Sequence, residues 1–134
     1  TSASQATLAD TTAPAVGVLS VSSTTITSIA VAWTAATDNY STSANIKYAL
    51  YYSTSNNIDT VANASANGTL LQDFANTPRS YTLTGLIPNT TYYFNVVSED
   101  EFGNKSAYAT LTQATQADTT APVPGASGVI SANE

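Results

Sequence analysis

Oxygen-bearing side chains in three separate stretches are the residues of this sequence best suited to binding a ligand. They are Asp10, then Asp38 and Asn39, and then Asp100 and Asn104. Carboxylate and amide oxygens are the hard ligands that Ca²⁺ prefers. Asp and Asn are also ordinary turn residues, because their side chains bond to nearby backbone groups. Two interpretations of these residues therefore stay open: they bind calcium, or they stabilise turns by bonding to nearby backbone groups.

Two residue types on which most hydrolytic mechanisms depend are missing. The sequence has no cysteine and no histidine, which rules out disulfides and Cys-based zinc sites and removes the commonest general base. Asp100 and Glu101 are adjacent acids, whereas glycoside hydrolysis needs two carboxyl groups that face each other across a bond. We therefore expect a protein that is not an enzyme and that has no cofactor apart from the hypothetical calcium ion.

The charge balance limits the partners. The formal net charge is -6, and the only cations are Lys47, Arg79 and Lys105. An acidic surface repels phosphate backbones and anionic lipids, and no apolar run approaches the roughly 20 residues that cross a bilayer. We expect no binding to nucleic acid and no membrane insertion. For an exported parent protein, the signal and anchor are expected outside this segment.

The elements that must position these residues are predicted to be strands. Thr, Ser, Ala, Asn and Val dominate the sequence, and short alternating stretches rich in β-branched and aromatic residues are separated by turn residues. This pattern predicts an all-β, seven-stranded antiparallel two-sheet sandwich. The expected strands are 16–22, 27–34, 46–53, 69–74, 80–83, 91–99 and 106–113. Residues 54–68 lack periodicity and are expected to form a long connection with a helical turn at 58–62.

Three of these strands show one buried face each. The predicted inward residues are Ile29, Val31 and Trp33; Tyr48, Leu50 and Tyr52; and Tyr92, Phe94 and Val96. Trp33 is expected to pack between the two sheets. The tyrosines left for the surface, where aromatic faces can stack on sugars, are Tyr40, Tyr51, Tyr93 and Tyr108.

One hexapeptide occurs twice. Ala-Asp-Thr-Thr-Ala-Pro occupies residues 9–14 and returns at 117–122, and the 108 residues from Asp10 to Asp118 are roughly the length of one sandwich domain. We therefore expect a flexible amino-terminal tail at 1–9, a domain at 10–116, and a linker with the truncated start of a next repeat at 117–134.

The stretch that runs from Leu86 through Pro88 and Tyr92 to Val96 resembles the Leu-x-Pro-x-Thr-x-Tyr-x-x-x-Val signature of fibronectin type III domains. In that resemblance Leu86 closes the bottom of the sandwich, Pro88 fixes a turn, and the Tyr92 hydroxyl returns to nearby backbone as a tyrosine corner. Trp33 on the second strand is also similar to that family. The hexapeptide is similar to linkers in bacterial multidomain surface proteins and secreted glycoside hydrolases.

The resemblance implies both a function and a position for the acidic residues. In the family's topology the entry linker and the loops of Asp38 and Asp100 meet at one pole of the sandwich, so the hypothetical calcium site would lie at that pole. The resemblance implies an extracellular or cell-surface bacterial module, monomeric, which serves as a spacer or in adhesion. The alternative is an accessory carbohydrate-associated module of a polysaccharide-degrading enzyme. The expected partners are neighbouring domains of the same chain, a host or cell-surface protein, or a polysaccharide.

Overall fold

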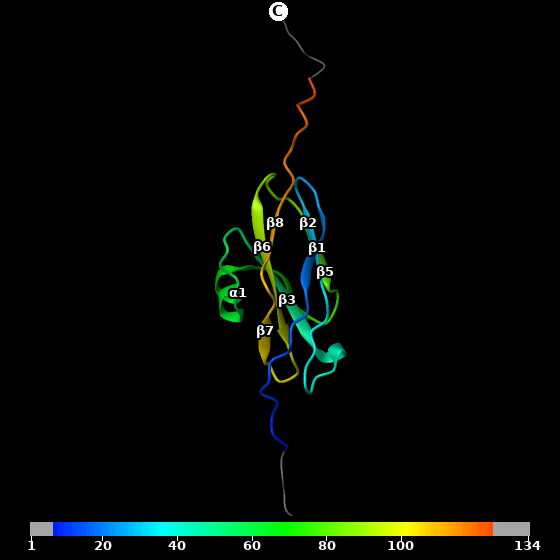
Figure 1. Ribbon diagram of the computed structural model, residues 1–134, viewed down its shortest axis with the longest axis vertical. Coiled ribbons are helices and arrows are strands. Elements are labelled where there is room, and N and C mark those ends of the chain that lie inside the picture. Colours follow the sequence, from blue (N-terminus) through cyan, green and yellow to red (C-terminus); the bar gives the residue numbers. More distant parts are fainter. Residues whose placement is uncertain (1–6, 125–134) are drawn as a thin grey trace, which may run out of the picture.

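Strand pairing sets the architecture of residues 7–124, which are the part of the chain that the computed structural model describes (Figure 1). One sheet has the order β1 (Leu19–Thr24), β2 (Ile29–Trp33), β5 (Ser80–Leu83). The other has the order β4 (Thr69–Ala75), β3 (Lys47–Ser53), β6 (Thr91–Glu99), β7 (Lys105–Ala107), with β8 (Leu111–Ala114) also paired to β6. All pairings are antiparallel. The predicted all-β sandwich of two sheets is confirmed.

The inner faces of the two sheets hold the main core. Ile29, Val31 and Trp33 alternate inward on β2, and Tyr92, Phe94 and Val96 do so on β6. Trp33 is only 4% exposed, and its ring lies 6.3 Å from the ring of Tyr48 on β3, centroid to centroid. The predicted inward faces are therefore confirmed, because alternation along a strand places every second side chain in the core.

The last predicted strand, 106–113, is divided into β7 and β8. Between them Tyr108 turns inward and becomes almost fully buried, its N–H donating to the Val96 carbonyl at 2.8 Å. The described residues therefore hold eight strands, where seven were predicted.

The first strand begins at Leu19, later than the predicted residue 16. The segment before Leu19 lies alongside the loop between β2 and β3 and does not pair within the sheet. Ala15 forms an isolated bridge with Thr37. A Cβ at Gly17 would lie 2.7 Å from the Thr34 carbonyl oxygen, so the close approach of these two segments requires glycine there.

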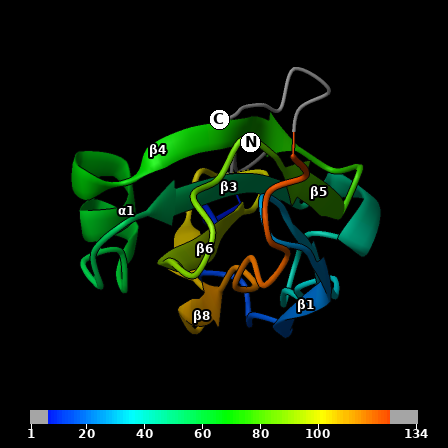
Figure 2. The same ribbon diagram turned by 90° about the horizontal axis from the view of Figure 1, so that it is seen from above.

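A second, smaller core covers the outer face of the larger sheet, where α1 (Val61–Asn67) lies beside β3 and β4 (Figure 2). Its buried residues are Ile58, Ala64 and Val97. Thr60 caps the helix by accepting from the Asn63 N–H at 3.0 Å. The helical turn predicted at 58–62 is therefore wrong in position, and the helix starts where Thr60 supplies the cap. No helix in residues 7–124 is long and apolar enough to cross a membrane.

The chain enters and leaves the sandwich at opposite ends. Figure 1 shows the amino-terminal segment at one end and the segment after β8 at the other. We call these ends the entry pole, formed by residues 10–14, 37–45 and 100–104, and the exit pole, formed by residues 25–28 and 84–90 with Gln116. The candidate site lies at the entry pole.

Candidate metal centre

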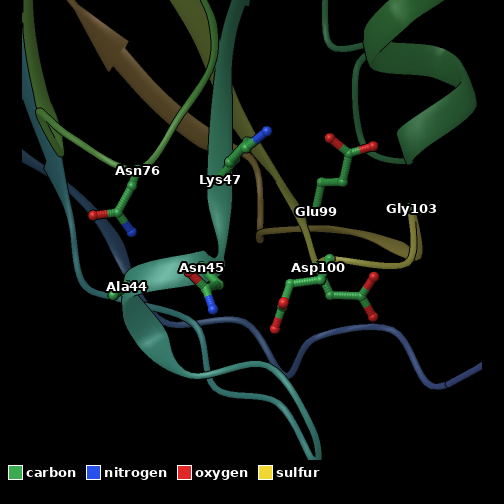
Figure 3. Close-up of a pocket in the computed structure, with 8 residues that line it drawn as sticks. Ala44, Asn45, Lys47, Asn76, Glu99, Asp100 and Gly103 are labelled. Carbon is green, nitrogen blue, oxygen red and sulfur yellow. The ribbon is translucent and has the colours of Figure 1, made fainter.

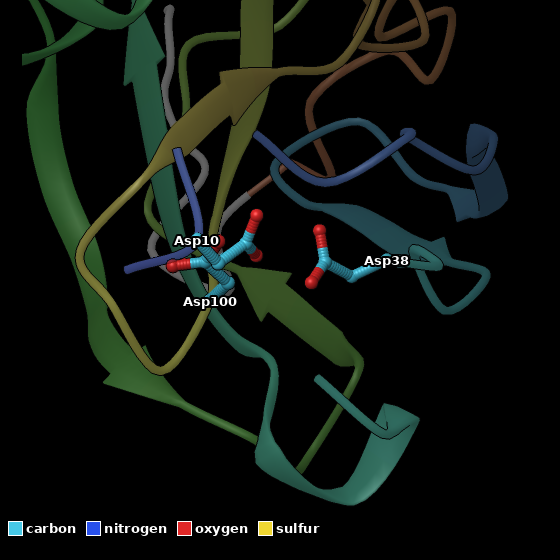
Figure 4. A group of neighbouring side chains, drawn as sticks. All are labelled: Asp10, Asp38 and Asp100. Carbon is cyan, nitrogen blue, oxygen red and sulfur yellow. The ribbon is translucent and has the colours of Figure 1, made fainter. Parts of the chain in front are cut away.

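Three carboxylates meet at the entry pole. Asp10, Asp38 and Asp100 each offer an oxygen, and these three oxygens lie within 4.8 Å of one another (Figure 4). Asp10 belongs to the entry linker, Asp38 to the loop between β2 and β3 (with η1, Ser43–Asn45), and Asp100 to the turn between β6 and β7. The fold thus brings together residues 28 and 90 positions apart from Asp10 along the chain.

Asp100 is the fixed member of the three. Its Oδ1 accepts from the N–H groups of Phe102 (2.8 Å) and Asn104 (2.9 Å), and its Oδ2 accepts from Asn104 Nδ2 (2.8 Å). The turn is closed by Gly103, whose φ of 83° is in the left-handed region. Burial by itself raises the pKa of Asp100, but the hydrogen bonds from Asn104 and Phe102 outweigh it, and the pKa lies below its ordinary value. Asp100 is therefore a carboxylate at neutral pH.

Asp10 and Asp38 each keep one oxygen without a donor. Asp38 Oδ2 accepts from the N–H groups of Tyr40 (3.1 Å) and Ser41 (2.8 Å), and Asp10 Oδ1 accepts from the Thr12 N–H (3.0 Å). The other two oxygens, Asp38 Oδ1 and Asp10 Oδ2, are buried, and no donor in residues 7–124 reaches them. A buried acceptor without a partner costs about 1 to 3 kcal/mol. A cation bound to these two oxygens would give each of them the missing partner.

The two predicted asparagines face the acids with their nitrogens. Asn39 Nδ2 donates to Asp10 Oδ1 at 3.2 Å. Asn104 Nδ2 donates both to Asp100 Oδ2 and to the Asp10 carbonyl, each at 2.8 Å. In this geometry they hold the acids in place, and the oxygens available to a metal are those of the three aspartates. Ca²⁺ takes six to eight oxygen ligands, so waters would complete its shell.

Further contacts fasten the entry linker to the domain. The Ser106 hydroxyl donates to the Pro14 carbonyl at 2.6 Å, and Ala15 and Thr37 exchange two backbone hydrogen bonds of 2.7 and 2.9 Å. Tyr48 and Tyr108 support the loop that carries Asp38: the Tyr48 hydroxyl accepts from the Ala36 N–H at 2.8 Å. These supports were not predicted, because neither tyrosine differs from an ordinary strand residue in its local pattern.

A polar groove of about 480 Å³ has Asp100 in its wall (Figure 3). Its charged walls are Lys47, Glu99, Asp100 and Glu101. Glu99 is engaged in an ion pair of 3.1 Å with Lys105, and both oxygens of Asp100 hold hydrogen bonds. The described residues therefore place no opposed, free pair of acids in this groove.

The residues of the signature lie at the exit pole and in the core, where they have structural contacts. The Tyr92 hydroxyl accepts from the Ile87 N–H at 3.1 Å, which is the geometry of a tyrosine corner. Leu86 is 8% exposed and belongs to the main core. Asn89, directly after Pro88, has a φ of 52° and completes the turn into β6.

The four tyrosines predicted for the surface differ in how far they are exposed. Tyr108 is 1% exposed, so its placement on the surface was wrong, because the break between β7 and β8 turns it into the core. Tyr51 and Tyr93 pack against the cluster under α1. Tyr40 is 64% exposed and meets Phe102 edge to face, with ring centroids 5.2 Å apart and planes at 74°. Within the described part of the chain, these four tyrosines do not form a flat stacking platform.

The sandwich, its tyrosine corner and its two poles define a modular β domain, and comparison with known proteins gives its family. The fibronectin type III domain model matches residues 13–114. The chain belongs to the fibronectin type III family.

Relatives show the settings of similar modules. The chain is 32% identical over 118 residues to Exoglucanase B of Cellulomonas fimi, which covers 88% of the chain and 9% of that protein. The structure of chitinase ChiA74 from Bacillus thuringiensis is 26% identical, with a TM-score of 0.55, over 83% of this chain and 15% of that one. A fibronectin type III domain of human fibronectin type III domain containing protein 3 shares the fold, with 17% identity, a TM-score of 0.56, and coverage of 93% and 100%. The chain thus spans less than a sixth of the two bacterial enzymes.

Proposed function

We propose that this chain is a non-catalytic spacer and binding module of a secreted or surface-exposed bacterial multidomain protein, and that a calcium ion at the entry pole fastens its linker. The observation that supports the calcium ion is the pair of buried oxygens without donors, Asp10 Oδ2 and Asp38 Oδ1. The match to small fractions of two bacterial enzymes supports the modular setting.

Electrostatics favours a cation at this point. Three carboxylates with oxygens within 4.8 Å repel one another, and such a group either binds a proton or binds a cation. Asp100 resists protonation because its hydrogen bonds lower its pKa. An all-oxygen set on loops suits Ca²⁺, whose coordination is flexible, better than Zn²⁺, which prefers nitrogen and sulfur ligands.

The ion would join three segments that are otherwise separate. Asp10 is the only one of the three aspartates in the linker, so calcium binding would fix the direction in which the chain enters the domain. Extracellular modules bind Ca²⁺ with dissociation constants of about 10⁻⁴ to 10⁻³ M. At millimolar calcium the gain in the free energy of unfolding would be about 0.4 to 1.4 kcal/mol.

The test is a thermal melt of the wild type, Asp10→Ala and Asp118→Ala, each in EDTA and in excess calcium. Asp118 is the matched control, because it has the same hexapeptide and its Oδ1 accepts from the Thr120 N–H at 3.0 Å, as Asp10 Oδ1 does from Thr12. We expect calcium to raise the melting temperature of the wild type and of Asp118→Ala by a few degrees and not that of Asp10→Ala. Identical wild-type melting curves with and without calcium would mean that the three aspartates only bond to nearby backbone groups in their turns and bind no calcium.

A second candidate is an accessory, carbohydrate-associated role in a polysaccharide-degrading enzyme. The names of the two bacterial relatives, an exoglucanase and a chitinase, favour it. The exposed pair of Tyr40 and Phe102 is the aromatic surface available for a sugar. Sedimentation of the chain with insoluble cellulose and with chitin tests this role. Retention that Tyr40→Ala abolishes would favour direct carbohydrate binding, whereas no retention on either polymer would leave the spacer function.

A further inference from the structure

The exit pole has exposed apolar side chains near Gln116, the last of residues 7–124 that is bonded to the domain. The Gln116 N–H donates to the Thr25 carbonyl at 2.9 Å, and the Gln116 carbonyl accepts from the Asn89 N–H at 3.1 Å. Beside these contacts Ile26 is 39% exposed and Ile87 is 65% exposed. Two exposed aliphatic side chains close in sequence to the residues that hold Gln116 offer apolar surface that a neighbouring module can cover.

The entry pole has exposed aromatic side chains near Asp10, the first of the described residues that is bonded to the domain. Asp10 is held there by Asn39 and Asn104. Tyr40 follows Asn39 directly, Phe102 lies on the same turn as Asn104, and the two exposed rings contact each other. Each ring already has the other as a neighbour, so covering the pair costs less side-chain freedom than covering two separate rings.

The repeated hexapeptide places these two poles next to each other in an array. Asp118 has the local turn of Asp10, and a following module would hold it at its own entry pole. Gln116 is bonded to the first module, so only Ala117 lies between the two fixed residues. Two residues of extended chain span at most about 7 Å.

We infer that Ile26 and Ile87 at the exit pole dock the Tyr40 and Phe102 pair of a second copy of this module. This inference rests on the proposed spacer function and names the partner. The contact is small, but a linker this short gives an effective concentration of about millimolar or more, at which a weak apolar contact is occupied. The modules then form a stiff rod, because entry and exit lie at opposite ends of each sandwich (Figure 1).

The test uses a two-module chain in which residues 1–117 are followed directly by residues 10–134. The junction keeps the natural sequence, because residues 10–14 and 118–122 are identical, and both copies retain every described strand. The chain has no cysteine, so Leu70→Cys in both copies allows one spin label in each. Pulsed electron spin resonance then measures the distribution of distances between the labels, in the presence of calcium.

We expect one narrow distribution for this two-module chain. Ile87→Asn in the first copy, or Phe102→Ser in the second, should broaden it. Val18→Asn in the first copy is the matched control, because Val18 is also 65% exposed but lies away from the exit pole, and it should leave the distribution narrow. A broad distribution before any such substitution, or a width that Ile87→Asn and Phe102→Ser leave unchanged in folded chains, would overturn the interface. The calcium response of the single module is measured separately, so this failure would leave the proposed function standing.

Discussion

The hydroxyl of Tyr108 donates a hydrogen bond of 2.6 Å to the backbone carbonyl of Thr34, 74 positions earlier in the chain. This bond connects the segment between β7 and β8 to the strand end that leads into the loop of Asp38. Tyr108 is also almost fully buried, and burial raises the pKa of Tyr108 to about 12 from its ordinary value of 10.0.

The first prediction concerns alkaline pH. Because the folded state holds the Tyr108 proton more tightly than the unfolded chain, its contribution to stability is complete below about pH 10 and is lost as the pH rises toward 12. Tyr108→Phe should lower the free energy of unfolding by about 1 kcal/mol at neutral pH and should flatten its decline above pH 10. Urea unfolding at a series of pH values checks this, with exposed Tyr40→Phe as control. An unchanged alkaline slope in Tyr108→Phe would contradict the buried phenol.

The second prediction concerns the tyrosine corner. Tyr92→Phe removes only the hydroxyl that accepts from the Ile87 N–H, and it leaves that donor without its partner. We expect a loss of about 1 to 3 kcal/mol in the free energy of unfolding. Chemical denaturation gives the value, and a midpoint equal to that of the wild type would show that the corner does not stabilise this domain.

The third prediction separates the two cores. Trp33→Ala deletes the largest side chain between the sheets and should cost about 3 to 5 kcal/mol. Ile58→Ala acts on the cluster under α1, where Ile58 is fully buried and its carbonyl accepts from Asn95 Nδ2 at 2.7 Å. Ile58→Ala should therefore raise hydrogen exchange at the amides of Ala64 and Gly68, which bond within α1, more than at amides of β2 and β6. Equal acceleration in both regions would mean that the outer cluster does not open separately.

The part of the fold that follows from alternation could be predicted. The inward faces of β2 and β6 could be predicted because apolar and polar residues alternate along each strand when one face packs on a core. The tyrosine corner at Tyr92 could be predicted from the fibronectin type III signature. Val97 could not be placed in this way, because it occupies an outward position and is buried in the cluster that it forms with Ile58 and Ala64 of the 54–68 segment. That segment shows no period, since its helix is short and its position depends on the cap at Thr60.

The candidate site could be assembled only through the fold. No local pattern relates Asp10 to Asp100, and the topology of the family is what places their loops at one pole. The directions of the side-chain amides could not be predicted either, because whether Asn104 presents its oxygen or its nitrogen depends on acceptors from Asp10 and Asp100 that meet only in the folded chain.

The most direct test of the account is a calcium titration followed in the amide NMR spectrum of the chain. The amides of Thr12, Ser41 and Phe102 each donate to one of the three aspartates, so a bound ion should shift all three together. We predict saturable shifts with one common dissociation constant of about 10⁻⁴ to 10⁻³ M, lost in Asp38→Ala and retained in Asp118→Ala. Unchanged positions of these three amides at saturating calcium would contradict the proposed metal centre.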